Sequence, residues 1–117
     1  MATILVLDDE VNVRRLLRAA LESVGYEVLD AADGRAGLML YRQHAADLVI
    51  TDIRMPALDG LDLLIELTRD FLNVKVIAMS GTRELLGRAK HLGARHTLHK
   101  PFDMKELLSA VKYELAQ

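Results

Sequence analysis

Short apolar runs with strand character alternate along the whole chain with segments of helical periodicity, and this alternation limits the possible folds more than any other feature. The apolar runs cover residues 3–7, 26–31, 48–51, 74–79 and 97–98. A helical segment is expected after each run. Strict alternation with short connections predicts an α/β fold with a parallel sheet and helices on both faces, because parallel neighbours need a right-handed crossover.

Each helical segment has aliphatic residues on one face, which predicts the side that packs on the sheet. The first segment covers residues 11–24, and Asp33 and Asp103 are the expected N-caps of the second and the fifth. Gly87 in the middle of the fourth costs about 1 kcal/mol relative to Ala, so we expect mobility there. The residues predicted to face inward are Leu16, Leu17, Ala20, Leu21, Val24, Ala36, Leu38, Leu40, Tyr41, Leu61, Leu64, Ile65, Leu67, Leu85, Leu86, Ala89, Leu92, Leu107, Leu108, Val111 and Leu115.

The composition fits one ordinary globular domain over residues 1–117, which is long enough to bury a core without disulfides or metal. The chain has no cysteine, and this excludes thiol catalysis and thiolate metal sites. A net charge of −2 gives no electrostatic reason to expect nucleic acid or an anionic membrane as a partner. There is no signal-peptide pattern and no run long enough to span a bilayer, so we expect a cytoplasmic protein.

Polar side chains follow four of the five predicted strands. Asp8 and Asp9 come after the first strand, Asp52 ends the third, Ser80 ends the fourth, and Lys100 follows the fifth. Function in a wound sheet gathers at the carboxyl ends of its strands, so we expect these groups to converge. Three carboxylates repel one another unless a cation neutralises them, and oxygen ligands with room for water suit Mg²⁺ better than zinc. A metal, a lysine and a hydroxyl around one carboxylate are also what phosphoryl transfer to an aspartate needs.

Four motifs at these strand ends together resemble the receiver domain of two-component response regulators, and the resemblance covers essentially the whole chain. The motifs are Leu5-Val6-Leu7-Asp8-Asp9-Glu10, Thr51-Asp52-Ile53-Arg54-Met55-Pro56 with Asp59-Gly60, Ala78-Met79-Ser80-Gly81, and Lys100-Pro101-Phe102. The resemblance implies a flavodoxin-like (βα)5 fold, a doubly wound five-stranded parallel sheet with strand order 2-1-3-4-5.

The resemblance also implies a phosphorylation site with Mg²⁺ as cofactor. Asp52 is the expected acceptor of a phosphoryl group from the phosphohistidine of a histidine kinase. Asp9 and Asp52 are expected to bind Mg²⁺ directly, Asp8 through a metal-bound water, and Arg54 through its backbone carbonyl.

Other residues of the motifs are expected to read the phosphoryl group and set its lifetime. Lys100 would pair with one phosphoryl oxygen and the Ser80 hydroxyl would bond another, which would reposition the loop after the fourth strand. Arg54 and Thr82 stand where the family varies residues that tune the loss of phosphate. Thr97 stands where the family usually has an aromatic residue, so coupling to the output face is expected to run through the backbone and the fourth helix, or the output differs.

The implied function is a phosphorylation-controlled switch that catalyses its own phosphotransfer and slow autodephosphorylation, rather than a conventional enzyme. The expected partners are a sensor histidine kinase or a phosphotransfer protein, and an output domain or partner protein read through the fourth helix, fifth strand and fifth helix. A phosphorylation-dependent homodimer also fits, whereas direct binding to nucleic acid or membrane is not expected. We expect residues 1–117 to be one receiver domain without an output domain, either a stand-alone receiver or the N-terminal domain of a longer regulator. The resemblance favours the second case, because Asp52-Ile53-Arg54-Met55-Pro56 is common in receivers with transcriptional outputs.

Two other functions fit the same fold. A Mg²⁺-dependent phosphatase that forms an aspartyl-phosphate usually has a second acid two residues after the nucleophile, where this chain has Arg54. A flavin-binding module would need glycine and hydroxyl donors in the loop after the first strand, where this chain has Asp8, Asp9 and Glu10.

Overall fold

Five parallel strands form one sheet in the order β2-β1-β3-β4-β5 in the computed structural model, which describes residues 1–117. The strands are β1 (Thr3–Leu7), β2 (Glu27–Ala31), β3 (Leu48–Asp52), β4 (Val76–Ser80) and β5 (His96–His99). The order reverses between β1 and β3, which pair side by side at the centre of the sheet. The predicted fold class and strand order are therefore confirmed.

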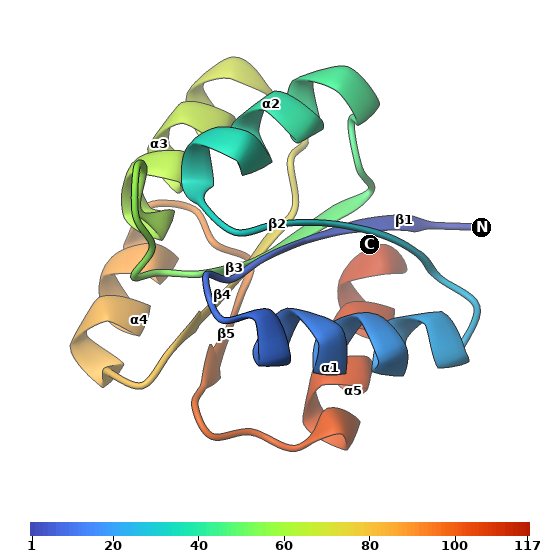
Figure 1. Ribbon diagram of the computed structural model, residues 1–117. Coiled ribbons are helices and arrows are strands. Elements are labelled where there is room, and N and C mark those ends of the chain that lie inside the picture. Colours follow the sequence, from blue (N-terminus) through green and yellow to red (C-terminus); the bar gives the residue numbers. More distant parts are fainter.

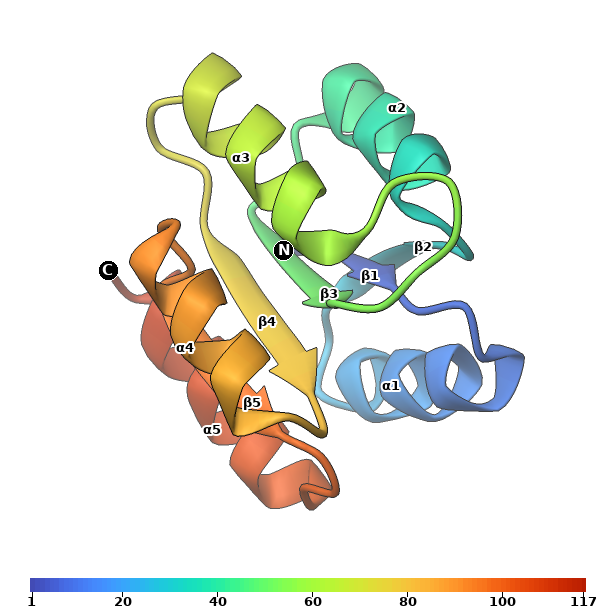
Figure 2. The ribbon, with the colours of Figure 1, turned by 90° about the vertical axis from the view of Figure 1, so that its left-hand side faces the viewer.

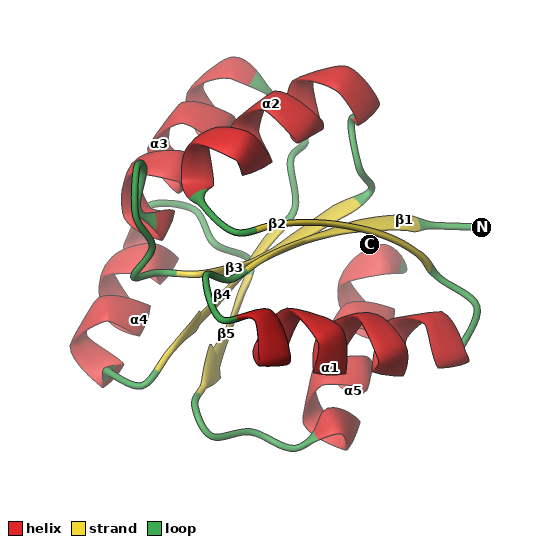
Figure 3. Cartoon of the chain, viewed as in Figure 1, coloured by secondary structure: helices red, strands yellow, loops and turns green.

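Five helices connect the strands and cover both faces of the sheet (Figure 1, Figure 3). Two of them, α1 (Val11–Ser23) and α5 (Met104–Leu115), lie on one face. The other face carries α2 (Gly34–His44), α3 (Gly60–Asp70) and α4 (Arg83–His91), and Figure 2 shows these three helices in a row. No helix combines the length and the apolar character that crossing a bilayer requires.

The predicted caps of two helices are present. The Asp33 carboxylate accepts a hydrogen bond from the Ala36 amide at 2.8 Å, and Asp103 accepts one from the Glu106 amide at 2.7 Å. Each carboxylate satisfies a backbone N–H that has no partner within the helix, and it also interacts favourably with the positive end of the helix dipole.

Side chains of the strands divide between two hydrophobic cores, because successive residues of a strand point to opposite faces. Leu5, Leu7 and Val49 face the helices α2, α3 and α4, whereas Ile4 and Val6 face α1 and α5. All residues of β3 and β4 are buried, as expected for central strands of a parallel sheet covered on both sides.

The buried face of α1 is narrower than predicted. Leu17 and Leu21 are fully buried, but Leu16 is 56% exposed and Val24 is 53% exposed. Neighbouring positions of a helix lie about 100° apart, so Leu16 cannot share the centre of the face with Leu17. Val24 lies just beyond the last residue of the helix.

The buried face of α3 is rotated relative to the prediction. Gly60, Leu63, Leu64 and Leu67 are buried at helical spacing, whereas Ile65 is 43% exposed. Gly60 lies against the end of β3, where its amide donates a hydrogen bond to the backbone carbonyl of Ile53 at 2.6 Å. Other residues predicted to face inward are only half-buried, namely Ala20, Ala36, Leu40, Leu61, Leu85, Leu92, Leu108 and Leu115.

Two glycines hold the loop between β3 and α3 in place. A Cβ atom on Gly60 would lie 2.5 Å from the backbone oxygen of Asp52, and a Cβ atom on Gly34 would overlap the backbone oxygen of Leu58. Both contacts are with backbone, which cannot rotate away as a side chain can. Around Gly87 in α4 the situation is the opposite, since a Cβ atom there would meet nothing within 4 Å.

Candidate functional site

The carboxyl ends of four strands bring the predicted site residues to one edge of the sheet. Asp52 is the last residue of β3 and Ser80 is the last residue of β4, while Asp8 follows β1 and Lys100 follows β5. This edge adjoins the point where the strand order reverses, which is where wound sheets bind their ligands.

Three carboxylates form the centre of the site. One oxygen from each of Asp8, Asp9 and Asp52 lies within 4.8 Å of the other two. Asp8 is fully buried and Asp52 is 9% exposed, whereas Asp9 is open to solvent. Oxygen-only ligands with one side open to water fit the preference of Mg²⁺, which keeps several waters when it binds to proteins.

Lys100 neutralises part of this negative charge. Its Nζ donates a hydrogen bond to Oδ2 of Asp8 at 3.0 Å and lies 3.2 Å from Oδ1 of Asp52. Burial alone would lower the pKa of the ammonium, but the bonds and charges of the two carboxylates outweigh burial and raise the pKa. Lys100 is therefore firmly protonated.

The pKa of Asp52 is raised above its ordinary value. Burial is the main cause, and the charges of Asp8 and Asp9 act in the same direction, while Lys100 opposes them. The ionised form of Asp52 is thus held in the site at a cost in free energy, and it gains from any additional positive charge placed beside it.

Asp8 is fixed by bonds to the start of α1. Its Oδ1 accepts a hydrogen bond from the Glu10 amide at 2.9 Å, and its backbone carbonyl accepts one from Nη1 of Arg14 at 2.7 Å. Arg14 was not predicted to contribute to the site. Its spacing of three and seven positions before Leu17 and Leu21 is the signal that could have identified it, because this spacing places all three on the sheet-facing side of α1.

Ser80 connects the site to α4. Ser80 is buried, with 4% of its surface exposed. Its Oγ accepts a hydrogen bond from the Thr82 amide at 3.1 Å. Thr82 is the N-cap of α4 but makes no cap bond with its own side chain. The hydroxyl of Ser80 therefore ties the first residues of α4 to the end of β4.

The side chains of two other predicted residues form no hydrogen bond or ion pair with the three carboxylates. The Arg54 side chain is exposed and lines a groove of about 370 Å³ with residues of α3 and α4. Thr97 lies on β5 and lines a separate groove of about 440 Å³ between α4 and α5. The structure therefore brings Thr82 beside Ser80 but does not bring Thr97 to the site.

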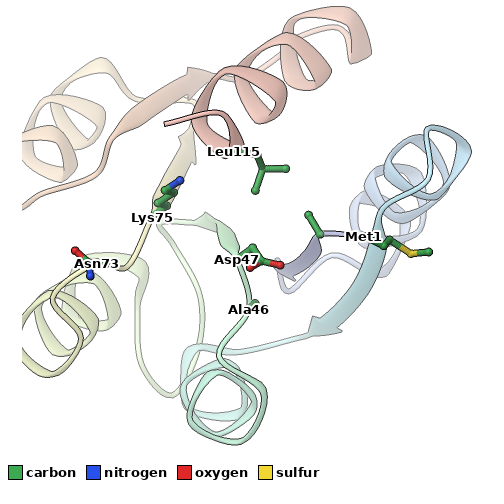
Figure 4. A pocket seen from close by; sticks show the side chains of 7 residues that line it. Met1, Ala46, Asp47, Asn73, Lys75 and Leu115 are labelled. Atoms are coloured by element: carbon green, nitrogen blue, oxygen red, sulfur yellow. The ribbon is translucent and has the colours of Figure 1, made fainter.

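A hollow of about 480 Å³ at the opposite edge of the sheet contains none of these residues (Figure 4). Met1 and Asp47 lie near the amino ends of β1 and β3, and Leu115 and Lys75 border the hollow on the α5 side. The Asp47 carboxylate accepts a hydrogen bond from the Thr3 amide at 2.8 Å, so its role is structural.

Residues 4–112 match the family model described as the response regulator receiver domain, and the chain belongs to this family. Receiver domains are phosphorylation-dependent switches of two-component signalling, which is the class of function predicted from the sequence. The family, the fold and the acidic site agree with one another.

Three known proteins illustrate the similarity. The probable transcriptional regulator ycf27 of Porphyridium aerugineum is 36% identical over 93% of this chain and 46% of its own length. Sporulation initiation phosphotransferase F of Bacillus subtilis is 34% identical over 93% of this chain and 90% of its own length. The CheX-CheY-BeF3-Mg²⁺ complex from Borrelia burgdorferi has a TM-score of 0.89 at 30% identity, covering 96% of this chain and 87% of that one.

The chain spans about half the length of several curated relatives that it matches, including the one from Porphyridium aerugineum. It spans nearly the whole of the Bacillus subtilis relative. None of the three proteins is named as a phosphatase or as a flavoprotein, so the comparisons give no support to either alternative function.

Proposed function

We propose that this receiver domain accepts a phosphoryl group on Asp52 from the phosphohistidine of a sensor histidine kinase or a phosphotransfer protein. The observation that carries the proposal is the position of the Lys100 ammonium, 3.2 Å from Oδ1 of Asp52 and beside two further carboxylates. This arrangement supplies one nucleophilic oxygen, one fixed positive charge and a set of oxygen ligands at one point.

In the proposed reaction a carboxylate oxygen of Asp52 attacks phosphorus, and the bond between phosphorus and the donor imidazole nitrogen breaks. The imidazole leaves with the bonding electron pair and takes up a proton. Lys100 stays protonated and donates to a phosphoryl oxygen while the Asp52 carboxylate gives up its negative charge to the new bond to phosphorus. Slow hydrolysis of the resulting aspartyl-phosphate by water returns the domain to its resting state.

Mg²⁺ would be held by Asp9 and Asp52 directly, by Asp8 through water, and by the backbone carbonyl of Arg54. Both oxygens of Asp8 already accept hydrogen bonds, from the Glu10 amide and from Lys100, which supports an indirect role for Asp8. When bound, Mg²⁺ would supply positive charge to the phosphoryl oxygens. The Borrelia burgdorferi relative has Mg²⁺ in its complex.

Phosphorylation would reach the output face through Ser80. When the Ser80 hydroxyl turns to donate to a phosphoryl oxygen, the Thr82 amide loses its acceptor and the start of α4 is released from β4. This route runs through backbone and α4, and it needs no aromatic residue at Thr97. Arg54 and the Thr82 side chain flank the loops around Asp52 and would modulate how long the phosphoryl group persists.

The output would be carried by the face formed by α4, β5 and α5. Its target is an output domain or a separate partner protein, and a phosphorylation-dependent homodimer through the same face belongs to the same proposal. The name of the Porphyridium aerugineum relative, a probable transcriptional regulator, favours a role in transcription regulation, with residues 1–117 acting as the switch domain in the cytoplasm.

Incubation of the protein with acetyl phosphate and Mg²⁺, followed by intact mass measurement, tests the proposal. We expect a gain of one phosphoryl group that Asp52→Asn abolishes and that Asp47→Asn, at the opposite edge of the sheet, leaves unchanged. A gain that survives Asp52→Asn would refute the assignment of Asp52. Repeated turnover of phosphoesters would instead support the phosphatase.

A further inference from the structure

The charges of the chain are distributed unevenly. Residues 71–102 contain six Lys and Arg residues and a single acid, Glu84, whereas residues 1–70 contain seven Lys and Arg residues and thirteen acids. Four of the six cations lie on α4 or immediately before β5, and we call them the basic edge: Arg83, Arg88, Lys90 and Arg95. Figure 2 shows α4 beside β5, which is one of the two edge strands of the sheet.

The fold does not neutralise the basic edge. None of its four cations has a carboxylate oxygen within 4.0 Å, whereas Arg18 on α1 pairs with Asp30 at 2.8 Å. All four residues are exposed. Lys90 does donate to the backbone oxygen of Arg95 at 2.7 Å, but this bond leaves its charge uncompensated.

A purely structural role explains only part of this pattern. Arg88 and Lys90 lie in the last turn of α4, where cations interact favourably with the helix dipole. Arg83 lies at the first position of α4, where a cation is unfavourable, and Arg95 lies outside the helix. An unpaired positive surface of this kind attracts a negatively charged partner.

A groove opens directly beside two residues of the basic edge. It has a volume of about 440 Å³ between α4 and α5, and Arg83 and Lys90 stand among its lining residues. Gly87 and Thr97 also line it and leave it open, because Gly87 has no side chain and Thr97 has a short one. Leu86 contributes the single hydrophobic side chain of the lining.

We propose that the basic edge docks an acidic segment of a partner protein, and that this segment inserts one aromatic side chain into the groove beside Thr97. The aromatic ring of the partner would occupy the space beside Thr97, which the side chain of a larger residue at position 97 would otherwise fill. The inference rests on the proposed function, since the same face would respond to phosphorylation of Asp52.

A protein segment fits this surface better than nucleic acid does. Glu84 and Glu106 border the basic edge and the groove, and the thirteen acids of residues 1–70 would repel a long polyanion. A short acidic segment contacts only the basic edge and avoids this repulsion. The net charge of the chain is −2, which is not the charge of a nucleic-acid-binding domain.

Fluorescence anisotropy with a labelled peptide, in which acidic residues flank a single Phe, tests the proposal on the full chain. We expect binding that weakens with added salt and that weakens about tenfold in the double variant Arg83→Glu with Lys90→Glu. The control Arg15→Glu with Arg35→Glu makes the same total charge change at exposed, unpaired positions on α1 and α2 and should leave binding unchanged. Peptide binding that the double variant and the control affect equally would overturn the proposal.

The variant Thr97→Tyr tests the groove separately from the charges. Thr97→Tyr should lower the affinity for the Phe peptide to that for a matched peptide with Ala in place of Phe. The affinity for the Ala peptide should not change. Tighter binding of a short DNA duplex than of the Phe peptide would also refute the proposal, in favour of nucleic acid. Phosphorylation of Asp52 is measured separately, by the gain in mass. If Asp52 gains a phosphoryl group but peptide binding does not depend on the charges of the basic edge, the docking proposal is wrong and the proposed function stands.

Discussion

The Thr82 amide donates a hydrogen bond to the Ser80 hydroxyl at 3.1 Å, so one side chain joins the end of β4 to the start of α4. Thr82 is the N-cap of this helix, and its own hydroxyl forms no cap bond. The stability of the first turn of α4 therefore depends on a group that the phosphorylation chemistry would also use.

Ser80→Ala should loosen α4 without any phosphorylation. Loss of the hydrogen bond leaves the Thr82 amide without its acceptor, and we expect a loss of about 1 kcal/mol in the free energy of unfolding. Relative to the unmodified protein, amide exchange in Ser80→Ala should become faster in residues 82–86, and should change little in the sheet and in the other helices. Ser109→Ala, at an exposed position of α5, is the matched control. Unchanged exchange at the start of α4 would show that the bond does not hold the helix.

Asp52→Asn should stabilise the domain at neutral pH when Mg²⁺ is absent. The pKa of Asp52 is raised in the folded chain by burial and by neighbouring acids, so the folded state holds the proton more tightly than the unfolded state. This contribution is fully present below the ordinary pKa of the carboxyl group and is lost as the pH rises through the raised pKa. Asn cannot ionise, so it avoids this loss.

Urea denaturation at neutral and at acidic pH checks the sign. The advantage of Asp52→Asn should appear at neutral pH and shrink as the pH falls below the ordinary range of a carboxyl group. If the stability advantage of Asp52→Asn grows on acidification, the folded chain favours the ionised form of Asp52, and the pKa of Asp52 is lowered rather than raised.

Lys100→Met should have opposite effects on Mg²⁺ binding and on phosphorylation. The ammonium and Mg²⁺ compete for the charge of Asp8 and Asp52, so its removal should tighten Mg²⁺ binding, measured by titration calorimetry. The rate of phosphorylation by acetyl phosphate should fall by about a hundredfold, because one fixed donor to the phosphoryl group is lost. Lys105→Met, which removes an exposed and unpaired cation, should change neither quantity. Weaker Mg²⁺ binding in Lys100→Met would argue that the lysine organises the acids rather than competing with Mg²⁺.

Two Gly→Ala changes should affect stability in opposite directions. A Cβ atom at Gly60 would lie 2.5 Å from the Asp52 backbone oxygen and 2.7 Å from Cα of Ile53, so Gly60→Ala should destabilise the fold by about 2 kcal/mol and slow phosphorylation by shifting Asp52. Gly87→Ala adds a methyl group in open space within a helix and should stabilise by about 1 kcal/mol. Thermal unfolding of both variants compares them directly, and equal stabilities would mean that the loop after β3 yields easily.

The positions of the main site residues could be predicted because each lies at the end of a strand. Once the alternation of strands and helices is established, Asp8, Asp52, Ser80 and Lys100 must meet at the same edge, whatever the details of packing. The family resemblance supplied their expected roles. The structure then confirmed the fold, paired Lys100 with Asp8 and Asp52, and placed Ser80 at the end of the neighbouring strand.

The exposure of side chains on the helices was harder to predict. Leu16 and Ile65 are as hydrophobic as their buried neighbours, and only the rotation of each helix about its axis decides which residue faces the sheet. That rotation depends on contacts outside the helix itself, such as Gly60 against Asp52 at the end of β3 for α3. The contribution of Arg14 depends in the same way on how α1 meets the end of β1.

The tight packing of Gly34 against Leu58 restricts movement on one side of Asp52 only. The loop after β3 is enclosed between α2 and the backbone of Asp52, so it has no room to relax toward α2 when a bulky group is attached to Asp52. The turn between β4 and α4 has no such barrier, and a covalent change should move that side alone. We therefore expect the exposed surface of α2 to tolerate a fluorescent label or a fused protein without loss of signalling, while the same addition on α4 would interfere with it.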